Sequence, residues 1–123
     1  MKKYNKLVRD KIVSGLKKKG LKPKHHIAWG SERWSTIKAK LEEEMKELAE
    51  AVDNYIHSES EEDEEKVIEE TADFLEILDK TLRYRGEGVS PSIGSQLSRV
   101  LNVMKKKARQ KGRFEEEIIL DEV

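Results

Sequence analysis

Two stretches, "LEEEMKELAEA" at residues 41–51 and "EETADFLEIL" at residues 69–78, decide the fold of this chain. In each, acidic residues are interleaved with apolar residues that recur every three or four positions, which is the period of an α-helix. The same periodicity predicts that the first stretch belongs to a helix from about Ser31 to His57. The second belongs to a helix that continues to about Leu82. The fold should therefore be built on two long amphipathic helices.

Residues with strong capping preferences mark the remaining boundaries. Expected helix starts are Ser31, Ser60 with Asp63 in a capping box, and Ser90 followed by Pro91. Expected helix ends are Gly20, after a short first helix over about Asp10 to Lys19, and Gly112. Residues 1–123 are thus predicted to form one all-α domain, a small bundle of four to five helices. A short extended tail, "FEEEIILDEV" at residues 114–123, should follow, with Ile118 to Leu120 packed against some other surface.

The composition indicates that one chain cannot bury all of its apolar stripes. Charged residues make up 41% of the sequence and hydrophobic residues 36%, and only 7 of the 123 residues are aromatic. Long helices with so little apolar material leave a thin core. We therefore expect the bundle to be completed by homo-oligomerisation.

The net charge is zero, but positive and negative residues lie in separate segments. Residues 1–24 carry ten Lys/Arg against one acid, residues 42–79 carry 17 acids against two Lys, and residues 99–113 carry seven Lys/Arg and no acid. A zero total argues against general nucleic-acid binding, and the absence of cysteine excludes disulfides and thiolate metal sites. No apolar run reaches the roughly 20 residues that span a bilayer, and the N-terminus lacks the apolar core of a signal peptide. A cytoplasmic protein without a membrane partner is expected.

Some of the acids lie where a purely structural helix would not place them. Successive helical residues rotate by about 100°, so Glu44 falls about 60° from the centre of its apolar stripe, with Glu47 further round on the same flank. On the next helix Glu70 has apolar neighbours at spacings of three, four and seven, namely Val67, Phe74 and Ile77. A carboxylate in such surroundings is costly to desolvate unless it is paired, protonated or bound to a cation. Asp73 is adjacent to Glu70, so two facing helices would present E-x-x-E opposite E-x-x-D.

The spacing leaves two interpretations open. In one, the four carboxylates bind Mg²⁺, with Mn²⁺ as a substitute, because this hard cation prefers oxygen ligands and retains positions for phosphate. In the other, the acids form salt bridges with Lys or Arg of a neighbouring helix. No His lies three residues after any of these acids, and this absence weakens a di-iron interpretation.

Further motifs favour the metal. The opening "YNKLVRDKI", Tyr4 to Ile12, resembles the signature of a group of small proteins related to phosphoribosyl-ATP pyrophosphohydrolase. The acids in E-E-x-x-E (Glu43, Glu44, Glu47) and E-x-x-D (Glu70, Asp73) are similar to the metal motif of the MazG-like, all-α NTP pyrophosphohydrolase superfamily. The ending "KARQKGRFEEEIILDEV" also resembles that group, with Arg113 where the group has a second glycine.

The resemblance implies a homodimer or a dimer of dimers with Mg²⁺-dependent activity. The expected reaction converts a nucleoside triphosphate, or a related nucleotide, to a monophosphate and pyrophosphate, as nucleotide-pool house-cleaning. By motif, Glu44, Glu47, Glu70 and Asp73 would be the metal ligands. A catalytically silent helical module, which binds nucleotides or partners and uses the same acids for salt bridges, is the alternative.

Other candidates complete the predicted site. Glu43 precedes the ligand pair and is the candidate general base; a solvated helix position explains it equally well. Phosphate-binding candidates are Lys6, Arg9 and Lys11 within the opening signature and Lys107 and Arg109 late in the fourth helix. Complementing the helix dipole is the alternative role of the last two. Trp29, in the connector, is the candidate for stacking on a nucleobase, whereas Trp34 fits the apolar stripe and is expected in the core.

Overall fold

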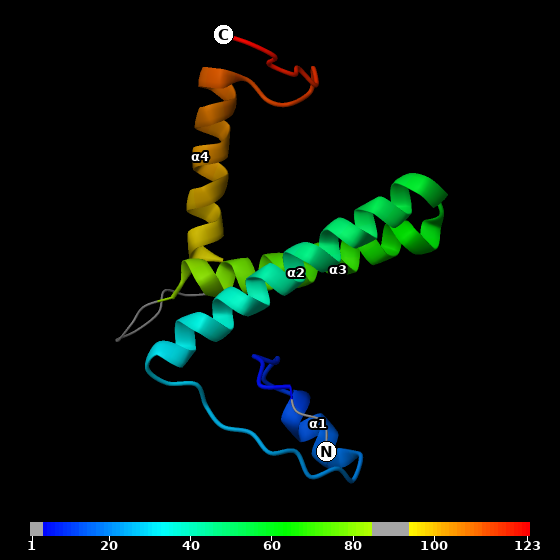
Figure 1. The fold of residues 1–123 in the computed structure, drawn as a ribbon. Coiled ribbons are helices and arrows are strands. Elements are labelled where there is room, and N and C mark those ends of the chain that lie inside the picture. Colours follow the sequence, from blue (N-terminus) through cyan, green and yellow to red (C-terminus); the bar gives the residue numbers. More distant parts are fainter. Residues whose placement is uncertain (1–3, 85–93) are drawn as a thin grey trace.

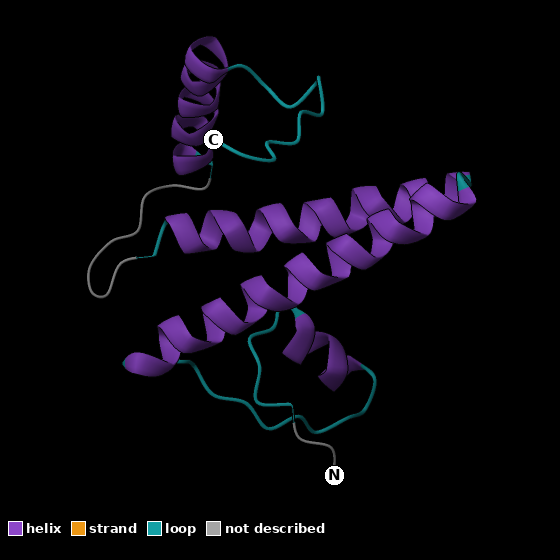
Figure 2. Cartoon of the chain, turned by 45° about the horizontal axis from the view of Figure 1, so that its top comes forward, coloured by secondary structure: helices purple, strands orange, loops and turns teal. Residues whose placement is uncertain are grey.

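The computed structural model describes residues 4–84 and 94–123, which form four helices and no strand. The helices are α1 (Ile12–Lys18), α2 (Ser31–Ser58), α3 (Glu61–Leu82) and α4 (Ser95–Lys111). Helices α2 and α3 lie side by side as a hairpin, and α4 leaves the end of α3 and points away from it (Figures 1 and 2). The predicted all-α class, a small helical bundle, is confirmed.

A two-residue turn joins α2 to α3. Glu59 adopts the left-handed conformation, with φ of 54°, and its N–H donates to the carbonyl of Tyr55. Ser60 then caps α3, because its hydroxyl accepts from the N–H of Asp63 at 3.2 Å. The predicted cap at Ser60 is confirmed, but the Asp63 carboxylate accepts from the hydroxyl of Ser58 instead of returning to Ser60. A turn this short fixes the two helices as antiparallel neighbours.

Other helix boundaries differ from the prediction by one or two residues. Ser31 is the first residue of α2, and the capping position belongs to Gly30, whose φ of 62° favours glycine. Helix α1 begins at Ile12 instead of Asp10, and no side chain caps it. Gly112 ends α4 as predicted, with φ of 81°. The predicted start at Ser90 and Pro91 lies outside the described residues.

The apolar core is very small. Among the described residues only Ile37 and Ala51 of α2 and Ile77 of α3 are buried hydrophobic residues. Trp34, expected in the core, is 42% exposed, and its ring contacts that of Tyr84 with the centroids 5.7 Å apart. Trp34 lies near the start of α2, at the end of the hairpin, and its ring meets that of Tyr84, which lies just beyond the end of α3.

A buried carboxylate attaches α4 to the end of α3. Asp79 is 3% exposed and accepts from Arg83 Nε at 2.8 Å and from the N–H of Gly94, just before α4, at 3.1 Å. The rest of α4 and the tail contribute no buried residue to the described structure. Ile118, Ile119 and Leu120 are 76–79% exposed, so their predicted packing is not found within this chain.

Candidate metal centre

Acids of both long helices converge at the middle of the hairpin. One carboxylate oxygen from each of Glu44, Glu70 and Asp73 lies within 4.8 Å of the others. A second group, formed in the same way by Glu43, Glu44 and Glu47, shares Glu44 with the first. The residues come together because α2 and α3 pack against each other, with Glu70 among the apolar residues of α3 and Glu44 on the flank of the apolar stripe of α2. The two predicted motifs therefore face each other.

Two of these acids are buried and only half satisfied. Glu44 is 5% exposed and Glu70 is 7% exposed. One oxygen of each meets a lysine one turn earlier on its own helix, Lys40 at 3.1 Å and Lys66 at 3.0 Å. The Oε2 atom of each is buried without a hydrogen-bond partner. An unpaired buried carboxylate oxygen is energetically unfavourable, and it is the kind of atom that a hard divalent cation ligates.

The electrostatics of Glu47 connect the two helices. Burial, followed by the charges of Glu44, Glu70 and Glu43, raises the pKa of Glu47 to about 6. Since Glu70 belongs to the opposite helix, Glu47 experiences the negative charge of both motifs. Carboxylates this close repel one another unless a positive charge lies between them. The donor set, carboxylate oxygens alone, fits Mg²⁺ or Mn²⁺ and does not fit a soft metal.

Basic residues of the opening signature lie at the edge of this acidic cluster. Arg9 places Nη2 2.7 Å from Asp73 and Nη1 3.9 Å from Glu76. Lys6 lies 3.5 Å from Glu43, which also meets Lys40 at 3.6 Å. The Arg9 and Asp73 side chains are 58% and 40% exposed, so the pair adds little stability. The signature is thus positioned beside the acids, and its cations are accessible to an incoming anion.

The other candidate residues are not brought to the cluster. Lys11 lies at the start of α1 and is exposed. Lys107 and Arg109 belong to α4, which contacts α3 alone among the helices and whose C-terminal end lies away from the hairpin (Figure 1). Trp29 is 83% exposed in the connector. Within one chain, therefore, Lys6 and Arg9 are the phosphate-binding candidates that reach the acids.

Lys40 and Lys66 were not predicted as part of the site. Each stands four residues before a buried acid, and this spacing is a sequence signal for a helical Lys–Glu pair. The hydrogen bond to Glu70 and the charge of Glu70 raise the pKa of Lys66. These two pairs agree in part with the salt-bridge interpretation. Each lysine, however, lies on the same helix as its acid instead of on the neighbouring helix.

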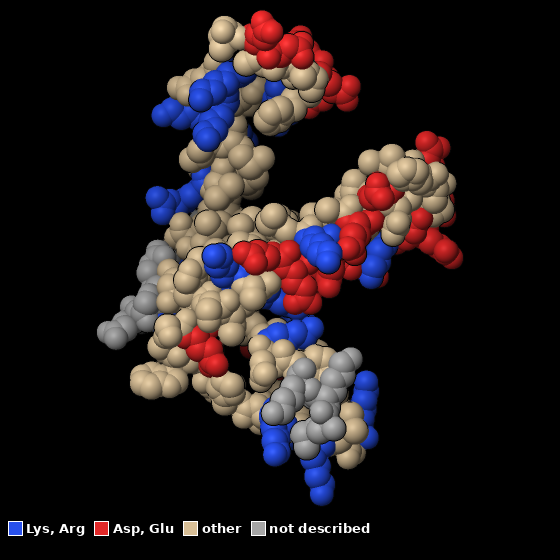
Figure 3. All heavy atoms as spheres, in the orientation of Figure 1, with Lys and Arg blue, Asp and Glu red and all other residues tan. Residues whose placement is uncertain are grey.

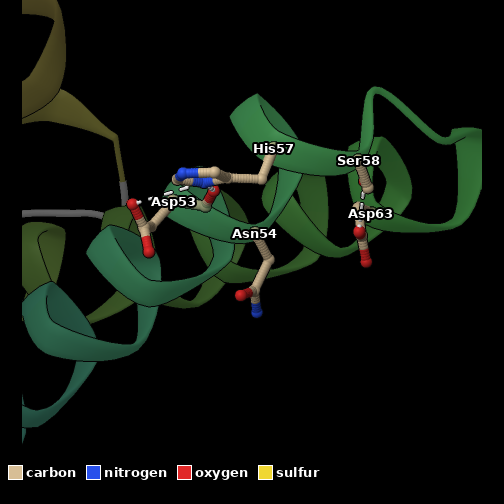
Figure 4. A pocket seen from close by; sticks show the side chains of 5 residues that line it. All are labelled: Asp53, Asn54, His57, Ser58 and Asp63. Atoms are coloured by element: carbon tan, nitrogen blue, oxygen red, sulfur yellow. Dashed lines mark hydrogen bonds and ion pairs between the residues drawn. The ribbon is translucent and has the colours of Figure 1, made fainter.

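A hollow at the turn end of the hairpin does not form a comparable site. It is lined by Asp53, Asn54, His57, Ser58 and Asp63 (Figure 4). The ring of His57 turns back to the carbonyl of Asp53, with Nδ1 at 2.7 Å, and Ser58 bonds to Asp63. The side chains of Asp53 and His57 are 74% and 76% exposed. These polar groups satisfy the helix ends and do not converge on a common point.

No family model, curated protein or solved structure matches this chain. Among the described residues, no helix is both long enough and apolar enough to cross a membrane.

Proposed function

We propose that this protein is a Mg²⁺-dependent nucleotide pyrophosphohydrolase that cleaves between the α- and β-phosphates to give a nucleoside monophosphate and pyrophosphate. The observation that supports it most is the pair of buried, half-satisfied carboxylates, Glu44 and Glu70, facing each other with Glu47 and Asp73 beside them. A structural helix pair has no need of such groups, because apolar residues at these positions would pack without a desolvation penalty.

Glu44, Glu47, Glu70 and Asp73 would hold the metal. When bound, Mg²⁺ supplies positive charge to the phosphate oxygens and lowers the pKa of a coordinated water. Glu43 has an oxygen within 4.8 Å of oxygens of Glu44 and Glu47. It is the candidate to accept the proton of the attacking water, and Lys40, 3.6 Å away, holds its carboxylate in place.

The cations of the opening signature would receive the phosphates. Arg9 has a planar guanidinium that can bind two phosphate oxygens at once, and it already lies 2.7 Å from Asp73 at the edge of the cluster. Lys6 lies beside Glu43 in the same way. Exchange of these carboxylate partners for phosphate oxygens would bring the nucleotide to the metal without rearranging the hairpin.

A catalytically silent nucleotide-binding or interaction module is the second candidate. It is favoured by the salt bridges themselves, because Lys40, Lys66, Lys6 and Arg9 already pair with acids of both motifs. In such a module the acids would serve to form these salt bridges and would not bind a metal. The two candidates differ in whether the unpaired oxygens of Glu44 and Glu70 bind a metal and support turnover.

Incubation with NTPs and dNTPs in Mg²⁺, with chromatographic measurement of monophosphate and pyrophosphate, tests the proposal. The variant Glu70→Gln should lose at least a hundred-fold in rate, because it neutralises a buried ligand. Its matched control is Glu69→Gln, one residue earlier on α3 with a side chain 69% exposed, which should retain activity. No turnover of any nucleotide, together with equal Mg²⁺ binding by wild type and Glu70→Gln, would exclude the enzyme.

A further inference from the structure

Helix α4 carries an apolar stripe that the described parts of the chain cover only in part. Leu97, Leu101, Met104 and Ala108 recur at helical spacing along one side. Leu101 and Met104 are each 54% exposed, and no described side chain of α4 is buried. Among the described helices, α3 alone contacts α4. An isolated helix of 17 residues is marginal in water without tertiary packing, so the stripe requires a partner surface.

The accessible surface of the whole chain points to the same need. It amounts to 11072 Å² for a chain of 14.3 kDa, whereas a compact monomer of that mass exposes about 6,800 Å². The excess is about 4,300 Å². Interfaces of obligate homodimers bury roughly 2,000–5,000 Å² in total, shared between the subunits. The excess on one chain is therefore ample for an interface of that class.

Charge identifies the surface that α4 fits. Helix α4 contains six Lys/Arg and no acid, whereas α2 and α3 together contain 17 acids and six Lys/Arg, a net charge of −11. In Figure 3 basic side chains gather on α4 and acidic ones along the hairpin. The hairpin also has exposed apolar residues along its length, namely Met45, Ile56, Ile68 and Leu75. It therefore matches α4 in both charge and apolar character.

The chain's own hairpin is not positioned to accept this helix. The carboxylate of buried Asp79 binds the N–H of Gly94 at 3.1 Å and so fixes the start of α4 at the end of α3. From that point α4 extends away from the hairpin to which it is attached (Figure 1). A nucleic acid would neutralise the basic residues but would leave Leu101 and Met104 in water.

We infer that α4 docks on the α2–α3 hairpin of a second copy of this chain, with its apolar stripe against the partner's apolar residues and its cations among the partner's acids. This association is independent of catalysis. It places Lys107 and Arg109, which do not reach the acids of their own chain, on a surface rich in acids. The expected species has at least twice the 14.3 kDa mass of one chain.

Sedimentation equilibrium of the full chain and two single variants tests this inference. Met104→Glu places a charge at the centre of the stripe and should raise the Kd of self-association at least ten-fold. Asn102→Glu introduces the same charge on the opposite side of α4 and should leave the Kd within about two-fold. Circular dichroism verifies that both variants remain helical. A wild-type chain that stays monomeric at 100 μM, with or without added RNA, would overturn the inference, as would equal effects of the two variants.

Zero-length carbodiimide cross-linking identifies the surface that accepts α4. This reagent joins an amine to a carboxylate only where the two are in contact. With a mixture of isotopically labelled and unlabelled chains, we expect mixed-isotope links between lysines of α4 and acids of α2 or α3. Links confined to chains of one isotope would show that α4 folds onto its own hairpin, and links absent from α4 would place the interface elsewhere. Either result refutes docking in trans.

Discussion

Divalent metal should stabilise this protein, and neutralising Glu70 should abolish that effect. In the metal-free chain burial, followed by the charges of Glu44, Glu70 and Glu43, raises the pKa of Glu47 from 4.5 to about 6. A rise of this size corresponds to about 2 kcal/mol between the protonated and ionised forms, and solvent at the partly exposed side chain reduces it toward about 1 kcal/mol. The share of this penalty that comes from the neighbouring carboxylates is free energy that a bound cation would relieve.

Binding adds the linkage contribution. A ligand that binds the folded state alone, at a hundred times its Kd, stabilises that state by about 2.7 kcal/mol. For a chain of this length each kcal/mol moves Tm by about 3–5 °C, so saturating Mg²⁺ should raise Tm by roughly 10 °C over the same sample in chelator. Both samples need equal protein concentration, because self-association also changes Tm.

Glu70→Gln separates the metal site from other effects of the ion. It removes one buried negative charge and the 3.0 Å ion pair of Glu70 with the exposed Lys66, which keeps its 3.9 Å pair with Glu69. The lost pair contributes about 0.5 kcal/mol or less. The metal-free variant should therefore melt a few degrees above metal-free wild type, and Mg²⁺ should shift its Tm by less than about 3 °C. Glu69→Gln should retain the full shift. An identical wild-type Tm in Mg²⁺ and in chelator, or a full shift in Glu70→Gln, would refute convergence of the acids on a cation.

Three further predictions concern single groups. The folded state holds the pKa of Glu47 above its ordinary value and therefore binds more protons than the unfolded state. The metal-free protein should gain about 1–2 kcal/mol of stability as the pH falls from about 7 to 4.5. Urea unfolding of wild type and Glu47→Gln at both pH values measures this gain, which the variant should lack. Arg9→Ala should change the free energy of unfolding by less than about 1 kcal/mol, since its ion pair is exposed. The same variant should lower kcat/KM at least ten-fold in the nucleotide assay. Unchanged kinetics would show that Arg9 does not belong to the site. Asp79→Ala should lower the free energy of unfolding by about 3 kcal/mol, because it removes the partner of the largely buried Arg83 and of the Gly94 N–H. Urea unfolding measures this loss. A loss below about 1 kcal/mol would show that this carboxylate does not hold α4 in place.

The sequence predicted the features that depend on neighbours along the chain. Helical period placed α2 and α3 to within a few residues, and the serine at position 60 marked the start of α3. The same period singled out Glu44 and Glu70 as acids near or on apolar stripes, and both are buried. These predictions succeed because a helix of 3.6 residues per turn fixes which side chains share a face, whatever that face later meets.

Where a local preference competed with packing, the sequence was less reliable. Trp34 follows the apolar stripe but lies close to the end of the hairpin, and it remains 42% exposed. Ser31 has the better capping side chain, yet Gly30 takes the capping position because the chain enters α2 with positive φ. The exposed Ile118 to Leu120 show that an apolar segment need not find a surface within its own chain.

Tertiary structure alone decided how the faces meet. The two-residue turn and the packing of α2 on α3 set the register of the two helices. In this register the charge of Glu70 contributes to the raised pKa of Glu47. The same structure places Arg9 against Asp73, 64 residues away. It also attaches the start of α4 to Asp79 at the end of α3, from where α4 points away from the hairpin (Figure 1). Periodicity contains no information on register or on the direction in which a helix leaves its neighbour. These depend on contacts between residues far apart in the chain, whose free energies are summed only when the whole chain folds.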